Sequence, residues 1–329
     1  MGTPLLVVVV VVGLAFDFTN GFHDTANYVA TWVGTRALSP RSAVAISAAA
    51  NLAGAFVTTA VAKTVAQGII DTSLATEQTV LVALLGAIIW NLLTWRLGLP
   101  SSSTHALIGG LVGAALVHSG AGGVQWHGVW EKVIVPGAVS PAVGFAGAFL
   151  LLLVIYRLFA RLTPGVANRG FRLGQLASGT WVAFAHGAND AQKTMGVIAL
   201  ALYTHGSISS FYIPDWVKVA AGLAIAAGTY AGGWRIIRTL GQRVYKMLPE
   251  HGFSAQLAAG TTLYAGTHLG FPISTTHVVT GSVMGAGATR RLSAVRWGIA
   301  GNIAFAWLLT LPAAAAVAAA LYYPVNWVF

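Results

Sequence analysis

The chain has 329 residues, of which 56% are hydrophobic and 8% are charged, and its mean hydropathy is +0.74. Soluble domains carry about 25% charged residues, so this composition excludes a soluble globular protein. The chain has no cysteine, which excludes disulfides and thiolate chemistry, and its formal net charge is +10. Windows without Asp, Glu, Lys or Arg, such as 133–156 and 252–289, are long enough to cross a bilayer. They predict an all-α, polytopic membrane protein.

Ten hydrophobic segments follow one another along the chain, and the basic residues between them are distributed unevenly. Odd-numbered connections hold fourteen of the eighteen Lys and Arg residues, whereas even-numbered connections hold only Lys63, Lys132 and Lys218. Because cytoplasmic loops are enriched in Lys and Arg, we expect odd connections to be cytoplasmic and both termini to be extracytoplasmic. The basic charge is therefore a topology signal, and nucleic-acid binding is set aside. The segments are roughly 4–33, 42–62, 79–95, 101–117, 133–156, 175–203, 216–234, 253–270, 273–289 and 297–323.

The first segment, 4–33, carries polar residues in the middle of apolar sequence. No basic region precedes its apolar run, so we expect a retained span and not a cleaved signal peptide. Ionisable groups are costly within a bilayer and mark functional sites there. Gly21, with Asn and Asp close by, predicts a break in this helix. The polar residues of the segment are Asp17, Asn20, His23, Asp24 and Asn27.

A stretch rich in Ser and Thr that ends in histidine occurs twice. Positions 98–114 and 270–286 share eight of seventeen residues at a constant offset of 172, which indicates an internal duplication. Each copy opens with Gly-x-Pro, passes through hydroxyl residues to His105 or His277, and continues as small, apolar sequence. This pattern is typical of a helix start, here placed deep inside hydrophobic sequence.

A weaker repeat joins the first segment to the sixth. The stretch 184–197 shares Phe, Gly and Asp with 18–31 at an offset of 166, so each half is expected to contain an Asp-bearing broken segment. Each half has five segments, and an odd number reverses the orientation of the second copy. The charge pattern favours Ser-Thr-His segments that cross the membrane over re-entrant loops. We therefore predict ten to twelve transmembrane helices in two inverted-topology repeats, 1–156 and 175–329, joined by a basic cytoplasmic linker at 157–174.

Such repeats present the ends of broken helices near the bilayer midplane, where transporters bind their substrates. Helix starts at the two Ser-Thr-His stretches would offer free N–H groups, hydroxyls and positive dipole ends to an oxyanion. Carboxyl and amide side chains offer hard oxygen ligands to a small cation, or a carboxylate to a proton. An anion and a cation bound together lower each other's desolvation cost, which favours symport. The predicted anion ligands are Ser102, Ser103, Thr104, Ser274, Thr275 and Thr276, and the predicted cation ligands are Asn20, Asp24, Asn27, Asn189 and Asp190.

The remaining polar residues of the segments leave alternatives open. Lys193 either neutralises Asp190 as a buried pair or contacts the anion directly. Histidine and amide side chains in membrane helices are more often contacts between helices than ligands. The residues interpreted in this way are Asn51, Asn91, His105, Gln256 and His277.

Four motifs resemble the inorganic phosphate transporter (PiT) family over nearly the whole chain: Asn20–Asn27, Gly187–Met195 and the two Ser-Thr-His stretches. The loop Thr35–Pro40 is similar to the low-affinity bacterial branch. The resemblance implies a secondary active transporter that takes up inorganic phosphate with H⁺ or Na⁺, as the free anion or as a neutral metal–phosphate complex. It implies a homodimer in the lipid bilayer of the plasma (inner) membrane, with no cofactor other than the coupling ion.

The resemblance also assigns the site. Some family members carry Glu where this chain has Asn51 or Gln256, so a proton-carrying role is not transferred to those positions. The resemblance implies that Asp24, Asn27, Asn189 and Asp190 form the site together with the two Ser/Thr clusters, and these four residues are candidate Na⁺ ligands. We count Asp24, Asp190, Gln192 and Lys193 among the predicted phosphate ligands as well.

Two other functions share some of these features. A sulfate permease would bind an anion of the same tetrahedral shape, but only phosphate donates a hydrogen bond to a carboxylate at neutral pH, which favours phosphate. Two intramembrane aspartates could also form an aspartyl protease dyad that shares a proton. That interpretation leaves the duplication unexplained, so we expect a transporter and not an enzyme.

Overall fold

The computed structural model describes residues 3–238 and 247–328, which fold into helices joined by short turns. Within these ranges there is no strand, and extended pairing is limited to an isolated bridge between Ile70 and Val124. The predicted all-α class is confirmed. The helices are α1 Thr3–Asp24, α2 Ala26–Gly34, α3 Pro40–Gly54, α4 Ala60–Gln67, α5 Glu77–Leu97, α6 Ser103–Ser119, α7 Trp126–Val129, α8 Val135–Leu158, α9 Pro164–Thr204, α10 Asp215–Ala231, α11 Trp234–Arg238, α12 Pro249–His268, α13 Thr275–Arg290 and α14 Trp297–Val328, with a π turn at Trp130–Ile134 and 3₁₀ turns at Ala121–Gly123 and Leu292–Ala294.

Four helical stretches are long and apolar enough to cross a membrane. Large apolar side chains on them, such as Leu150 and Leu308, are exposed on the outside of the molecule. A surface of this kind suits lipid and not water. The fold is therefore that of a helical membrane protein, as its composition predicts. The four stretches are Pro4–Gly34, Glu77–Leu97, Trp126–Leu158 and Trp297–Val328.

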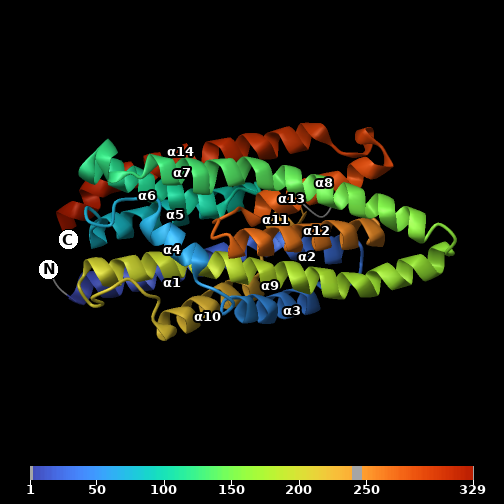
Figure 1. The fold of residues 1–329 in the computed structure, drawn as a ribbon, viewed down its shortest axis with the longest axis horizontal. Coiled ribbons are helices and arrows are strands. Elements are labelled where there is room, and N and C mark those ends of the chain that lie inside the picture. The colour runs from blue at the N-terminus through green and yellow to red at the C-terminus, as the bar shows by residue number, and fades with distance from the viewer. Residues whose placement is uncertain (1–2, 239–246, 329) are drawn as a thin grey trace.

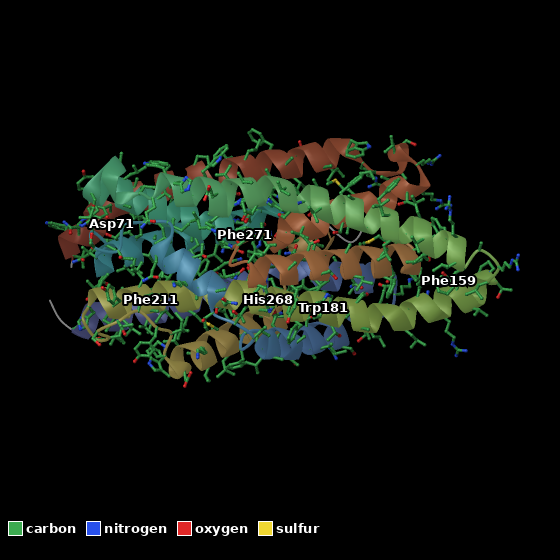
Figure 2. All side chains as sticks on the ribbon, in the orientation of Figure 1. Asp71, Phe159, Trp181, Phe211, His268 and Phe271 are labelled. Carbon is green, nitrogen blue, oxygen red and sulfur yellow. The ribbon has the colours of Figure 1, made fainter. Side chains whose placement is uncertain are left out.

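The two ends of the molecule differ in which parts of the chain they carry. The first and last described residues lie together at one end, and the turn between α8 and α9 lies at the other (Figure 1). Asp71 lies toward the first end and Phe159 lies at the second (Figure 2). We call them the terminal end and the linker end.

The first long stretch is interrupted at a single residue. α1 ends at Asp24 and α2 begins at Ala26, while Thr25 between them keeps helical dihedral angles, with φ −47° and ψ −35°. The break predicted at Gly21 therefore lies at Thr25 instead. Gly21 has a packing role: a Cβ there would lie 2.2 Å from Ile225 O, so only glycine lets α1 and α10 approach this closely.

The corresponding helix of the second half is continuous. α9 runs without interruption through Asp190, so the predicted break in the sixth segment is wrong. The glycine of that motif, Gly187, serves close packing and not a break, because a Cβ there would lie 2.1 Å from Asn51 O in α3. The breaks in other helices, between α3 and α4 and between α10 and α11, were not predicted. Residues 164–174, predicted as linker, form the first turns of α9.

The two Ser-Thr-His stretches form the bends of two helical hairpins. α5 and α6 pack together across the bend 98–102, and α12 and α13 pack together across the bend 269–274. Gly98 and Gly270 turn the chain with φ of 68° and 73°, left-handed values that glycine adopts without strain. Helices then begin at Ser103 and Thr275, so the predicted helix starts are confirmed.

The first hairpin contains the two segments predicted at 79–95 and 101–117 as its two arms, α5 and α6. Its bend lies in the middle of the molecule, where the Ser103 hydroxyl is 3.0 Å from Asp24 Oδ2. Its free ends lie at the terminal end, where His118 Nδ1 is 2.5 Å from Tyr322 OH, near the end of α14. A hairpin, like two crossings, returns the chain to the side it left. The prediction of an inverted second half, which depends on five segments in each half, is therefore unaffected.

Each hairpin packs against the last helix of the other half. α6 lies against α14, and α13 lies against α8. Matched glycines make both approaches possible: a Cβ at Gly113 would lie 2.1 Å from Ala315 O, and a Cβ at Gly285 would lie 2.1 Å from Phe145 O. The two halves are therefore interlocked, and the hairpin bends meet between them.

Candidate functional site

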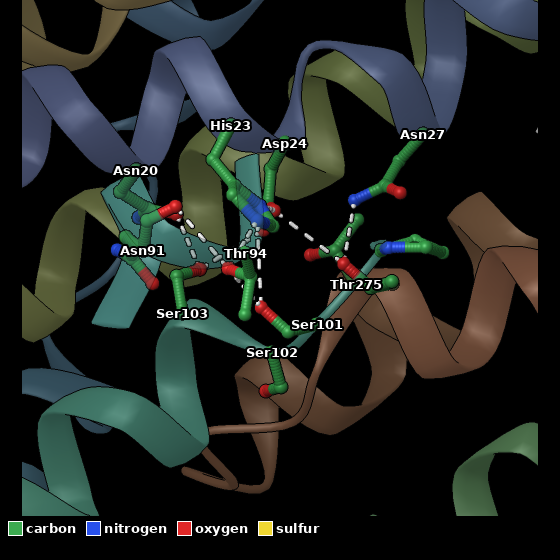
Figure 3. Close-up of polar contacts among 12 residues, drawn as sticks. Asn20, His23, Asp24, Asn27, Asn91, Thr94, Ser101, Ser102, Ser103 and Thr275 are labelled. Atoms are coloured by element: carbon green, nitrogen blue, oxygen red, sulfur yellow. Dashed lines mark hydrogen bonds and ion pairs between the residues drawn. The ribbon is translucent and has the colours of Figure 1, made fainter. Parts of the chain in front are cut away.

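Four parts of the fold converge in the middle of the molecule. They are the interruption between α1 and α2, the middle of α9, and the bends of the two hairpins (Figure 3). The polar side chains there are almost entirely buried; Asp24 is 2% exposed and Asp190 is 0% exposed. Buried polar groups need partners, and these side chains find most of theirs in one another.

Asp24 receives contacts from both hairpins. Ser103 at the start of α6 lies 3.0 Å from its Oδ2, and Thr276 at the start of α13 lies 3.4 Å from its Oδ1. His23 Nδ1 lies 2.8 Å from the same Oδ1. Asn27 donates to Thr276 Oγ1 at 3.1 Å. One carboxylate thus joins the ends of two helices that start in different halves of the chain.

Asp190 has a parallel set of partners. Its Oδ1 lies 2.7 Å from Lys193 Nζ and accepts a hydrogen bond from Thr275 at 3.3 Å. Its Oδ2 accepts one from Asn20 at 3.2 Å, and the Ser103 hydroxyl lies 2.6 Å from Asn20 Oδ1. The two aspartates are therefore connected through Asn20 and Ser103.

Lys193 forms the buried ion pair, the first of its two predicted alternatives. Its ammonium group also donates to Thr104 Oγ1 in the first hairpin and lies 3.4 Å from Ile273 O in the second. One side chain of α9 therefore holds both bends. Because Thr104 is also a predicted anion ligand, the ammonium group stands directly beside the place where the anion is expected.

Asn51 sets the orientation of a further histidine, His186. Asn51 Nδ2 donates to two hydroxyl groups, so its Oδ1 accepts the hydrogen bond from His186 Nδ1 at 2.6 Å. His186 Nε2 then faces both carboxylates, 3.8 Å from Asp24 Oδ2 and 3.6 Å from Asp190 Oδ2. A neutral ring would turn a lone pair toward two negative charges, so this geometry suits a proton or a metal ion between them. The three ligand atoms lie within 4.8 Å of one another.

Not every predicted site residue turns its side chain into this cluster. Gln192 Oε1 accepts hydrogen bonds from the amides of Val61 and Ala62, so it caps α4. Ser102 and Ser274 accept the amides of His105 and His277 and cap their own hairpin helices. The predicted residues that do meet in the cluster are Asn20, Asp24, Asn27, Ser103, Thr104, Asp190, Lys193, Thr275 and Thr276.

Asn189 takes an intermediate place at the second hairpin. Its Nδ2 donates to Thr267 Oγ1 at 2.9 Å and to Phe271 O at 3.0 Å. Its Oδ1 is buried and has no hydrogen-bond partner among the described residues. An amide oxygen in this state is a suitable ligand for a small cation.

Sequence reasoning did not select His23, Ser101 or His186 as part of the site. His186 lies one helical turn before Asp190, a spacing that places both side chains on one face of α9, and this signal was available. His23 and Ser101 meet only through the tertiary fold, where Ser101 Oγ lies 3.4 Å from His23 Nε2.

The charges of this region do not balance. Among the described residues, three buried carboxylates, Asp17, Asp24 and Asp190, face the single buried ammonium group of Lys193. With the histidines neutral, the fixed charge is negative. An anionic substrate would be repelled by these carboxylates, and the repulsion is strong where water is excluded. Such a substrate can therefore enter this region only together with cations. This arrangement can therefore bind an oxyanion and cations together.

Comparisons with known proteins agree with this chemistry. The model of the phosphate transporter family matches residues 20–318. A probable low-affinity inorganic phosphate transporter of Mycobacterium tuberculosis is 50% identical over 330 residues, which cover 98% of this chain and 78% of that protein. A protein of the same description from Rhizobium meliloti is 48% identical over 327 residues, 98% of this chain and 97% of that protein.

A solved structure has the same fold. It is described as the sodium-dependent phosphate transporter, and it superposes with a TM-score of 0.91 at 25% sequence identity, covering 99% of this chain and 100% of that one. The fold and the site define a membrane transporter and not an enzyme, which removes the protease alternative. The chain belongs to the phosphate transporter family, and the predicted resemblance is confirmed.

Proposed function

We propose that this protein is a secondary active transporter that carries inorganic phosphate across the plasma membrane by symport with a cation. The single observation that supports this most is the meeting of two helix starts from opposite halves at two buried carboxylates. The helix starts attract an anion, and the carboxylates attract cations. Neither group could be buried alone at low cost.

Phosphate would lie between the starts of α6 and α13. Their free amides and the hydroxyls of Ser103, Thr104, Thr275 and Thr276 are directed to the same region, and Lys193 is in contact with one of these hydroxyls. Monohydrogen phosphate can donate its proton to Asp24 or Asp190, whereas sulfate has no proton to donate. This difference supports phosphate over the sulfate alternative.

The coupling cation would be held by carboxyl and amide oxygens of Asn20, Asp24, Asn27, Asn189 and Asp190. Na⁺ is favoured because these are hard oxygen ligands and because the structural neighbour is described as sodium-dependent. H⁺ is the alternative. The grouping of His186 Nε2 with the two carboxylates supports a further possibility, transport of phosphate as a metal complex, in which the metal ion is cargo.

We also propose the predicted arrangement of ten to twelve membrane helices in two inverted repeats, 1–156 and 175–329, in which the two arms of each hairpin count as separate helices. The reciprocal packing of each hairpin on the last helix of the other half supports it. The common end for both termini supports an even number of crossings. Both termini would then be extracytoplasmic and the 157–174 connection cytoplasmic. A homodimer is proposed from the family resemblance alone.

Uptake of labelled phosphate into proteoliposomes tests the function, with Na⁺ and pH gradients imposed separately. The gradient that drives accumulation identifies the coupling ion. Asp24→Asn and Asp190→Asn should each abolish coupled uptake, while Asp215→Asn, which changes an exposed carboxylate, should not. Normal coupled uptake in both site variants would contradict the proposal, and inhibition by excess sulfate would favour the sulfate alternative.

A further inference from the structure

A second set of buried polar groups lies next to the phosphate site, toward the terminal end. It consists of Asp17 in α1, Asn91 in α5 and Thr194 in α9, and none of these side chains is more than 1% exposed. We call this set the Asp17 cluster. None of the assigned phosphate or cation ligands belongs to it.

The three side chains share an unusual property. Both oxygens of Asp17, both polar atoms of Asn91 and the hydroxyl of Thr194 lack a hydrogen-bond partner within the described ranges. Asp24 and Asp190, only a short distance along the same helices, have several partners each. A buried carboxylate without partners is costly, so such a group either takes up a proton or is held by a water molecule or an ion.

The helix register brings the three side chains together. α1 and α5 run in the same direction, with a Cβ at Gly13 lying 3.7 Å from Leu84 and His23 Nε2 lying 3.3 Å from Thr94. Counting inward from either contact places Asn91 level with Asn20. Asn91 is therefore about one helical turn from Asp17 along the shared face.

The opposite wall of the cluster comes from α9. This helix runs antiparallel to α1, with a Cβ at Gly13 lying 3.1 Å from Ile198 and Asn20 bonded to Asp190. Thr194 lies midway between these two contacts, level with Asp17, and it and Asn20 are the polar side chains beside the Asp17 carboxylate. Three helices thus contribute one carboxylate, one amide and one hydroxyl to a single place.

Neighbouring charges do not neutralise Asp17. The nearby ammonium group of Lys193 is engaged by Asp190 at 2.7 Å, and Asp190 itself adds negative charge. The local field therefore favours a cation. The available donors are carboxylate, amide and hydroxyl oxygens, the hard ligands that suit a small alkali cation and not a transition metal.

We propose that Asp17, Asn91 and Thr194 bind a Na⁺ ion at a position separate from the cation ligands at Asp24 and Asp190. Gly13, Leu84 and Ile198 form an apolar layer on its terminal side, and Asn20 separates it from the phosphate site. The ion would offset the excess negative charge before phosphate enters. Its role in transport rests on the proposed function, but its binding does not.

Direct binding of radioactive Na⁺ to the purified, full-length protein in the absence of phosphate tests the proposal. Asp17→Asn should lower the saturating amount of bound Na⁺ by the equivalent of a single ion per chain. Thr194→Val, which keeps the shape of the side chain, should weaken the apparent Na⁺ affinity about tenfold, the effect of losing one oxygen ligand. Asp215→Asn provides the matched control, because it removes an exposed carboxylate.

The outcomes separate this proposal from the function itself. One fewer bound Na⁺ in Asp17→Asn and a weaker Na⁺ affinity in Thr194→Val support the cluster even in a preparation that takes up no phosphate. Wild-type Na⁺ binding in both variants overturns it, whether or not transport is normal. The proposal is also overturned if Asp17→Asn binds Na⁺ like the wild type but releases fewer protons when the protein is titrated. Asp17 would then be a protonated acid and not a Na⁺ ligand. Thr194→Val keeps the test decisive should Asp17→Asn fail to fold.

Discussion

Lys193 connects several parts of the site through one buried side chain. Its ammonium group is fully buried, pairs with Asp190 and contacts both hairpin bends. A buried ion pair contributes little net stability, but removal of one partner leaves an uncompensated charge. The pair therefore ties the stability of the site to its function, because the same ammonium group is in position to meet an incoming anion.

Removal of this ammonium group should affect stability and transport differently. Lys193→Met leaves Asp190 unpaired and should destabilise the protein by about 3–5 kcal/mol. Adding Asp190→Asn should restore most of that loss without restoring phosphate uptake. Thermal unfolding in detergent together with the uptake assay measures both effects. If the double variant stays as unstable as the single variant, the pair is not the source of the loss.

His186 offers a test at the residue scale of whether phosphate travels with a metal ion. If a metal ion lies between Asp24, Asp190 and His186 Nε2, chelation with EDTA should lower wild-type uptake and added divalent metal should restore it. His186→Asn removes this ligand and should make the remaining uptake insensitive to EDTA. Wild-type uptake that is insensitive to EDTA would contradict a transported metal ion and leave phosphate as the free substrate.

At the scale of elements, the hairpin bends were the most predictable part of the site. Gly-x-Pro followed by hydroxyl residues predicts a helix start from local chemistry alone, and both starts lie where the duplication places them. Local chemistry could not distinguish which hydroxyls cap the helix and which face the site. That distinction depends on the turn geometry, which directs Ser102 to its own helix and Ser103 to Asp24.

Helix continuity was less predictable than the helix starts. The motifs around Gly21 and Gly187 look alike in sequence, yet α1 is interrupted after Asp24 and α9 is continuous. Both glycines are required by a neighbouring backbone, which a sequence pattern does not reveal. The Asp17 cluster was missed for a similar reason: its residues are far apart in sequence and meet only through the register of three packed helices.

The different roles of the neighbouring residues Ser102 and Ser103 in the first hairpin can be tested separately. Ser102→Ala removes only a helix cap and should cost about 1 kcal/mol of stability while leaving the affinity for phosphate nearly unchanged. Ser103→Ala removes a side chain that contacts Asn20 and Asp24, and should mainly weaken uptake. Thermal unfolding and the phosphate dependence of uptake distinguish the two. An equal loss of affinity in both variants would show that Ser102 also contacts the substrate.

At the scale of the whole molecule, interlocking of the two halves explains why the site lies where it does. Each hairpin packs on the last helix of the other half, so movement of one half relative to the other must move the bends that surround the proposed phosphate site. An inverted arrangement would expose the site to opposite sides of the membrane by the same type of motion. Alternating exposure of the site therefore depends on the two hairpins entering the membrane from opposite sides.

The absence of native cysteine makes that orientation directly measurable. Gly122 follows α6, and Gly298 lies in the first turn of α14, beyond the corresponding helix α13; at both positions an added side chain would meet open space. Inverted repeats predict that Gly122→Cys reacts with a membrane-impermeant maleimide in intact cells, whereas Gly298→Cys reacts only after permeabilisation. Gly165→Cys, at the start of α9, should behave like Gly298→Cys because both lie at the linker end. Labelling of Gly122→Cys and Gly298→Cys from the same side would mean that the two hairpins enter from one face, and alternating exposure of a site between them would then require a different motion.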